Sequence, residues 1–63
     1  MITEKEFNIT AQICDRQDPY RQTILFNDII HAENEQLARS AFAGTIGLTH
    51  DIIRIYSVCE IEK

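Results

Sequence analysis

The fold of this chain is determined mainly by residues 23–47, which read TILFNDIIHAENEQLARSAFAGTIG. The first part, up to Ala32, is rich in Ile, Leu and Phe, as is typical of a β-strand. Asn34 then stands where a helix N-cap is expected, with a glutamate on each side near the positive end of the helix dipole. Gly47 is expected at the C′ position, where a left-handed turn favours glycine. A narrow stripe at helical spacing lies between them, formed by Leu37, Ala38, Ala41, Phe42 and Thr45.

Two further strands are predicted on either side of this stretch. Residues 7–13 (FNITAQI) alternate apolar and polar side chains with a period of two, which indicates a strand with one buried face. Asp18 and Pro19 signal a turn, so the first two strands are expected to form a hairpin. Residues 51–61 (DIIRIYSVCEI) are rich in β-branched and aromatic side chains, which indicates a third strand after the helix.

The strand order follows from direction and handedness. A strand-helix-strand crossover makes the second and third strands parallel, whereas the hairpin makes the first strand antiparallel to both. With the first strand in the centre, every neighbouring pair is antiparallel. The predicted fold is therefore α+β, with β-β-α-β order, a three-stranded antiparallel sheet of order 2-1-3 and one helix packed on one face. Residues 1–63 are expected to form a single domain.

The charge balance excludes several classes of partner. Ten acidic and six basic side chains give a net charge of −4. Nucleic-acid binding depends on neutralising phosphates, so no nucleic-acid partner is expected, and the same electrostatics disfavour a membrane surface. No apolar run approaches the roughly 18 residues of a membrane span, and the acidic start MITEKEF does not resemble a signal peptide. A cytoplasmic location is expected.

Cys14 and Cys59 are expected to be free thiols. Two cysteines are too few for a disulfide scaffold, and the chain has no CxxC pair that would indicate zinc. In the predicted sheet they lie about 23 Å apart, at roughly 3.3 Å per residue along antiparallel strands. This separation is beyond the reach of a disulfide, and free thiols suit a reducing cytoplasm.

Catalytic or metal chemistry has little support in the sequence. His31 and His50 are the only histidines, and neither has nearby partners that would complete a metal site or a catalytic pair. Asp28 interrupts an apolar strand, where an aspartate that faces solvent or protects a sheet edge is expected. Cys59 has no electropositive neighbour that would activate it. We therefore expect a protein that is not an enzyme, with no catalytic, cofactor-binding or metal-binding residues.

A single helix covers only one face of the sheet, so apolar side chains are expected on the other face. The helix side is assigned Phe7, Ile9, Ala11 and Ile13 from the first strand and Ile24, Phe26, Ile30 and Ala32 from the second. The third strand carries Ile53, Ile55, Cys59 and Ile61 on one parity and Ile52, Tyr56 and Val58 on the other, and which parity faces the helix stays open. The expected exposed cluster is Leu25, Ile29, Tyr56 and Val58. It would approach a few hundred Å², the size at which a patch indicates binding, unless β-bulges or flanking side chains cover it.

Partner binding is the expected function. The candidate binding residues are Tyr56, Arg54, Val58, Leu25 and Ile29, with Tyr56 as the anchor because interfaces favour tyrosine. Residues 52–61 would also form a sheet edge guarded only by Arg54 and Glu60, open to an added strand. The sequence thus indicates a small module for protein–protein interaction. The alternative is a structural domain that associates with itself as a homodimer.

Residues 26–38 (FNDIIHAENEQLA) and the Ile53-Arg54-Ile55 element form a recurring pattern. A strand ends in an Ala-x-Asn/Thr-x-x-x-Ala step into a helix, and a later strand is centred on Ile/Val-Arg-Ile/Val. Over about residues 23–61 the chain resembles the repeat unit of a small archaeal and eukaryotic large-subunit ribosomal protein family, whose members are basic where this chain is acidic. It is also similar to small phage proteins, among them a podovirus inhibitor of host RNA polymerase and some anti-CRISPR proteins. That resemblance implies a phage- or mobile-element-encoded inhibitor of a larger host protein, with Arg54 in the binding region.

Overall fold

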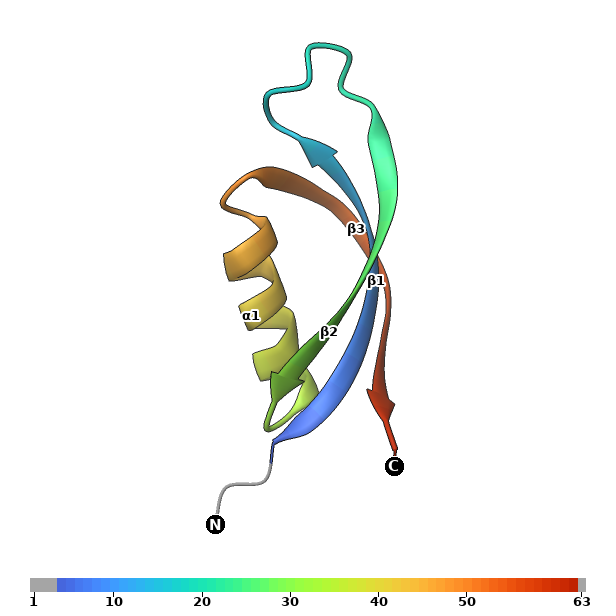
Figure 1. Cartoon of the computed structure of the whole chain (residues 1–63), viewed down its shortest axis with the longest axis vertical. Coiled ribbons are helices and arrows are strands. Elements are labelled where there is room, and N and C mark those ends of the chain that lie inside the picture. Colours follow the sequence, from blue (N-terminus) through green and yellow to red (C-terminus); the bar gives the residue numbers. More distant parts are fainter. Residues whose placement is uncertain (1–3, 63) are drawn as a thin grey trace.

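The computed structural model describes residues 4–62 and has the predicted β-β-α-β order. β1 (Lys5–Asp15) and β2 (Thr23–Ala32) form a hairpin, α1 (Glu35–Ile46) covers one face, and β3 (His50–Ile61) returns beside β1 (Figure 1). The sheet order is β2-β1-β3, and both neighbouring pairs are antiparallel. The predicted α+β fold and its strand order are confirmed.

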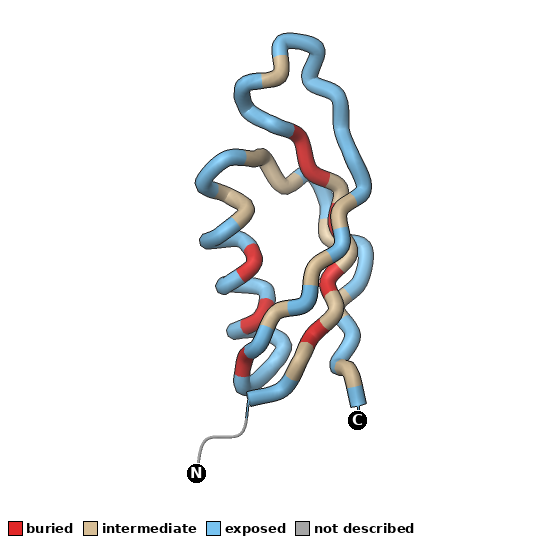
Figure 2. Tube along the Cα trace, viewed as in Figure 1, coloured by how far each residue is buried: buried red, intermediate tan, exposed pale blue. Residues whose placement is uncertain are grey.

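The core lies between α1 and the central strand β1. Alternate residues of β1 are buried, and the buried side of α1 faces them (Figure 2). Phe42 of α1 is fully buried, and its ring lies 6.3 Å from that of Phe26, centroid to centroid. Asn34 caps the helix as predicted, because its side chain accepts a hydrogen bond from the Leu37 N–H at 2.9 Å. The core cluster is formed by Phe7, Ile9, Ala11, Ile13, Ala32, Ala38 and Phe42.

The C-terminal end of α1 differs from the expectation. Gly47 is the C-cap and has right-handed dihedral angles, φ −63° and ψ −13°, so no left-handed turn follows the helix. Glycine is nevertheless required there for lack of space, since a Cβ atom at Gly47 would collide with the carbonyl oxygen of Ala43. The backbone N–H of Gly47 donates a hydrogen bond to the same oxygen at 2.8 Å.

The molecule is elongated, with principal extents of 46 × 18 × 14 Å. The 12 residues of α1 span about 18 Å, so the far end of the β1–β2 hairpin extends beyond the helix (Figure 1). Ile24 lies on the helix side of the sheet, as predicted, but it is not covered by the helix. Ile24 pairs with the buried Ile13 in the register, yet it is 54% exposed because the helix does not reach it.

β3 departs from the strict alternation predicted for it. Its register against β1 shifts twice, and the residues left without a partner, Tyr56 and Ile53, are the extra residues of two β-bulges. Ile52, Ile55 and Val58, spaced by three, consequently all lie opposite buried β1 residues and pack half-buried against the core. Neither predicted parity is right, and the bulges considered as an alternative are present. Val58 belongs to the helix side, so its expected place in an exposed cluster is wrong.

Both cysteines are free, Cys14 buried and Cys59 exposed. The register places Cys14 opposite Asp51 and Cys59 opposite Asn8, in different parts of the sheet, as the predicted topology requires. Among the described residues, no helix has the length and apolar character to cross a membrane.

Candidate protein-interaction face

One face of the sheet is left uncovered by α1. Because the odd-numbered residues 7–13 of β1 are buried under the helix, residues 6, 8, 10 and 12 point to the opposite side, and residues directly across from them share that side. We call this surface the open face. It consists of Glu6, Asn8, Thr10 and Gln12 on β1, Leu25, Asn27, Ile29 and His31 on β2, and Arg54, Tyr56, Ser57, Cys59 and Ile61 on β3.

The centre of the open face is polar and internally hydrogen-bonded. The amide of Asn27 donates to Asn8 Oδ1 at 2.6 Å and to Thr10 Oγ1 at 2.9 Å. Gln12 donates to Thr23 Oγ1 at 2.8 Å and accepts from the Tyr56 hydroxyl at 3.2 Å. These bonds hold side chains of all three strands in one arrangement. Polar side chains therefore separate Leu25 and Ile29 from Tyr56 within the exposed cluster expected from the sequence.

Large apolar side chains stand on both sides of this polar centre. On β2, Leu25 is 70% exposed and Ile29 is 47% exposed, and they lie opposite Gln12 and Asn8. On β3, Tyr56 is 52% exposed. The structure thus brings Leu25, Ile29, Arg54 and Tyr56 to one face, and separates Val58 from them.

Arg54 and Tyr56 form the most structured part of the open face. The guanidinium carbon of Arg54 lies 5.4 Å from the centroid of the Tyr56 ring, a cation–π contact worth about 0.5–1 kcal/mol when exposed. Tyr56 is itself an inserted bulge residue, and Arg54 lies between the two bulges. Under strict alternation from Ser57, Arg54 would point into the core and Ile55 would point outward. The bulge at Tyr56 therefore brings this arginine to the open face.

Both edges of the sheet are protected. On β2, the Asp28 carboxylate accepts a hydrogen bond from the Ile29 N–H at 2.9 Å and so occupies a backbone donor that an added strand would need. On β3, two bulges interrupt the ladder, and Glu60 forms an ion pair with Lys5 at 3.5 Å. The expected edge-protecting role suits Asp28. The bulges make β3 a poorer template for strand addition than its sequence indicates.

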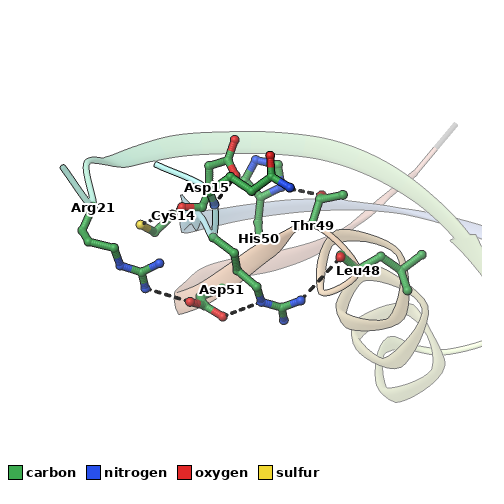
Figure 3. Close-up of polar contacts among 9 residues, drawn as sticks. Cys14, Asp15, Arg21, Leu48, Thr49, His50 and Asp51 are labelled. Atoms are coloured by element: carbon green, nitrogen blue, oxygen red, sulfur yellow. Dashed lines mark hydrogen bonds and ion pairs between the residues drawn. The ribbon is translucent and has the colours of Figure 1, made fainter. Parts of the chain in front are cut away.

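A second polar cluster lies at the hairpin end, around Asp51 (Figure 3). Its carboxylate accepts from Arg21 at 2.7 Å and from Arg16 at 2.9 Å, and these hydrogen bonds, the one from Arg21 first, hold the pKa of Asp51 below its usual range. Arg21 has a left-handed backbone with φ 54°, and Arg16 also donates to the Leu48 carbonyl at 3.4 Å. The cluster ties the β1–β2 loop to the start of β3. The sequence offered no local signal for it, because 30 or more residues separate Asp51 from each arginine.

The histidines do not meet. His31 lies opposite Glu6 near one end of the sheet, whereas His50 lies opposite Asp15 near the other end. The Nδ1 atom of His50 is 2.7 Å from the hydroxyl of Thr49. Within residues 4–62 no group of three or more His, Cys, Asp or Glu side chains has a metal-binding arrangement. We therefore build no catalytic or metal chemistry on either histidine.

Surface hollows occur toward both ends of the described part of the molecule. One, of about 450 Å³, is lined by Glu4, Lys5, Glu6, Glu60, Ile61 and Glu62. The other, of about 420 Å³, is lined by Asp15, Arg16, Gln17, Leu48, Thr49 and His50. The lining of the first is mostly charged, unlike the largely apolar lining of small-molecule sites, whereas the second also exposes apolar surface.

Comparison with known proteins finds no relative of this chain. No protein-family model matches the chain, and no curated protein or solved structure matches it significantly.

Proposed function

We propose that this chain is a small non-enzymatic module that binds another protein through the open face. The observation that carries the proposal is the exposure of Leu25, Ile29 and Tyr56 around a hydrogen-bonded polar centre on the face that α1 leaves uncovered. Tyrosine and arginine are, with tryptophan, the residue types most enriched among binding hot spots, and here they are in contact with each other. A rigid sheet face also loses little conformational freedom on binding.

Inhibition of a larger protein is the form of binding we propose. Its basis is the resemblance to small phage inhibitors, which act by stoichiometric protein binding, together with the small size of the chain. On this proposal a phage or another mobile element encodes the chain, and the target is a host protein.

A homodimer is the second candidate, and the same exposed residues support it. Across the polar centre, the Leu25 and Ile29 column of one copy could pack on the Tyr56 side of a second copy about a two-fold axis. Small domains with thin cores often gain stability in this way. In that case the open face would be occupied by the chain itself.

Absolute mass by light scattering on a sizing column, at several concentrations, separates these candidates. A monomer of 7.3 kDa leaves the open face available to another protein, whereas a stable dimer that Leu25→Ser dissociates indicates self-association.

For a monomer, tagged chain serves as bait in an extract of the host cells in which the chain is produced. A partner should be retained by the unmodified chain and by Leu37→Ser, which alters an exposed helix residue, but lost with Leu25→Ser and Tyr56→Ala. Retention by all four baits would reject the open face as the binding surface.

A further inference from the structure

Arg54 differs from the other basic residues that the structure describes because it forms no ion pair. The other four form ion pairs, and these are Lys5–Glu60, Arg16–Asp51, Arg21–Asp51 and Arg39–Glu35. Arg54 is exposed, and its one recorded interaction is with the ring of Tyr56. Acidic side chains outnumber basic ones in the whole chain, so a cation left without a carboxylate is unexpected on charge balance alone.

The position of Arg54 suits it to recognition. The Tyr56 ring lies against its guanidinium, and the ring is oriented by the hydrogen bond from its hydroxyl to Gln12. A stacked arginine keeps its in-plane N–H donors available for a planar acceptor. Because the side chain is already positioned, less conformational freedom is lost when a partner binds.

We propose that Arg54 binds a carboxylate of the partner, so that the open face recognises a protein segment in which Asp or Glu stands beside a large apolar residue. This inference rests on the proposed protein-binding function and adds the chemistry of the partner. Arginine and carboxylate form paired, charge-assisted hydrogen bonds whose geometry gives specificity as well as affinity.

The strand register shows how far an apolar contact of the partner at Leu25 would lie from Arg54. Leu25 and Arg54 both lie opposite Gln12, on either side of β1. Two strand spacings separate them, about 10 Å. A partner that places a carboxylate on Arg54 and an apolar side chain against Leu25 therefore needs these groups within about that distance.

Charge favours a protein carboxylate over nucleic-acid phosphate. A phosphate backbone needs several cations, yet Asp51 already holds both Arg16 and Arg21. The net charge of −4 would also repel a polyanion. A single carboxylate within an apolar surface needs only one arginine.

The test selects ligands from a displayed library of random peptides whose C-termini are fused to the display protein, so that carboxylates come from Asp and Glu side chains alone. Purified chain is the target, and enriched peptides are then measured as synthetic C-terminal amides. We expect enrichment of Asp or Glu near aromatic or aliphatic residues.

Arg54→Gln should weaken binding of the selected peptides about tenfold or more, the usual effect of losing a charge-assisted hydrogen bond. Arg39→Gln, which removes a helix arginine paired with Glu35, should leave binding unchanged.

A double-mutant cycle isolates the proposed contact. Changing the acidic residue of a selected peptide to its amide should weaken binding to the unmodified chain and cause little further loss with Arg54→Gln. Peptides without an acidic preference, or equal binding to Arg54→Gln, would overturn the carboxylate inference. If such peptides still required Leu25 and Tyr56, the open face would stand as the binding site.

Two other outcomes count against the proposals. Binding of a labelled single-stranded oligonucleotide that depends on Arg54 and Tyr56 would replace the protein carboxylate with a nucleic acid. Enriched peptides that bind equally to Leu25→Ser and Tyr56→Ala, or a selection that enriches none, would count against the open face itself.

Discussion

Tyr56 and Gln12 are joined by a hydrogen bond from the tyrosine hydroxyl to the glutamine Oε1 atom, 3.2 Å long, across 44 residues of sequence. The bond crosses from the bulged strand β3 to the central strand β1 on the face that the helix does not cover. It positions the ring on which Arg54 rests. The one aromatic side chain of the open face is thus held by the sheet and does not move freely in solvent.

The bulges of β3 predict that two isoleucines of equal parity differ in their contribution to stability. Ile55 packs half-buried against the core, whereas Ile53 is an extra bulge residue and 52% exposed. Ile55→Ser should lower the free energy of unfolding by at least about 1 kcal/mol, because it removes buried apolar area and places a hydroxyl there. Ile53→Ser should change it by about 0.5 kcal/mol or less. Urea unfolding of both variants measures the difference, and equal losses would argue for a regular, unbulged strand.

Asp51 predicts a pH-dependent part of the stability. Hydrogen bonds from Arg21 and Arg16 hold the pKa of Asp51 below its unfolded value. The folded state therefore binds a proton less readily than the unfolded chain, so the contribution is present above the unfolded pKa and lost as pH falls through the folded one. The melting temperature of Asp51→Asn should lie below that of the unmodified chain near neutral pH. The gap should close toward about pH 2. A gap independent of pH would show that the ion pairs do not stabilise the fold.

The two arginines that pair with Asp51 can be removed one at a time to measure what each contributes to stability. Removing either arginine alone leaves Asp51 one ion pair, so Arg16→Gln and Arg21→Gln should each lower the melting temperature less than Asp51→Asn does. High salt should reduce all three effects, because the side chains are largely exposed. Salt-insensitive losses would instead indicate a packing defect in the β1–β2 loop.

Asp28 predicts resistance to edge-to-edge association. Its carboxylate occupies the Ile29 N–H and places a charge on β2, the sheet edge formed by the hairpin. Asp28→Ala frees that donor, so we expect an average mass that rises with concentration in light scattering. Glu33→Ala removes an equal charge just beyond β2 and serves as the control. If both variants behave alike, net charge and not edge protection controls association.

The two thiols predict a difference in reactivity. Cys59 is exposed and Cys14 is 1% exposed. Native protein should therefore react with a thiol reagent in a fast phase that Cys59→Ser abolishes. The second thiol should react only when the chain unfolds, and its rate should report on opening of the hairpin end. Fast reaction of both thiols in native protein would contradict the burial of Cys14.

Most of the fold could be predicted because its signals are local. The alternation of residues 7–13, the Asn34 cap and the glycine at the helix end each depend on neighbours within a few positions, and direction then determines strand order. The bulges could not be predicted in the same way. The spacing by three of Ile52, Ile55 and Val58 indicates bulges only when the pairing of β3 with β1 is known.

Only the part of the open face that lies on the regular strand β2 could be predicted from the sequence. Leu25 and Ile29 belong to a regular strand, so parity placed them correctly, whereas Val58 and Arg54 depend on bulges that exchange the two faces. The exposure of Ile24 depends on how far the helix reaches along the sheet. The Asp51 cluster requires two segments distant in sequence, the β1–β2 loop and the start of β3, and pattern alone contains no information about their meeting.

The register also brings the ends of the described chain together. Glu6 near the start of β1 lies opposite Ile61 at the end of β3, on adjacent antiparallel strands. A short turn could thus connect the last strand to the first, and the polypeptide would become a closed ring of three strands and one helix. Such a ring could be opened in the β1–β2 loop to give a circular permutant with β1 and β3 as its new hairpin. Because β1 pairs with both other strands, the β3–β1 hairpin would then replace the β1–β2 hairpin as the local element from which folding can start.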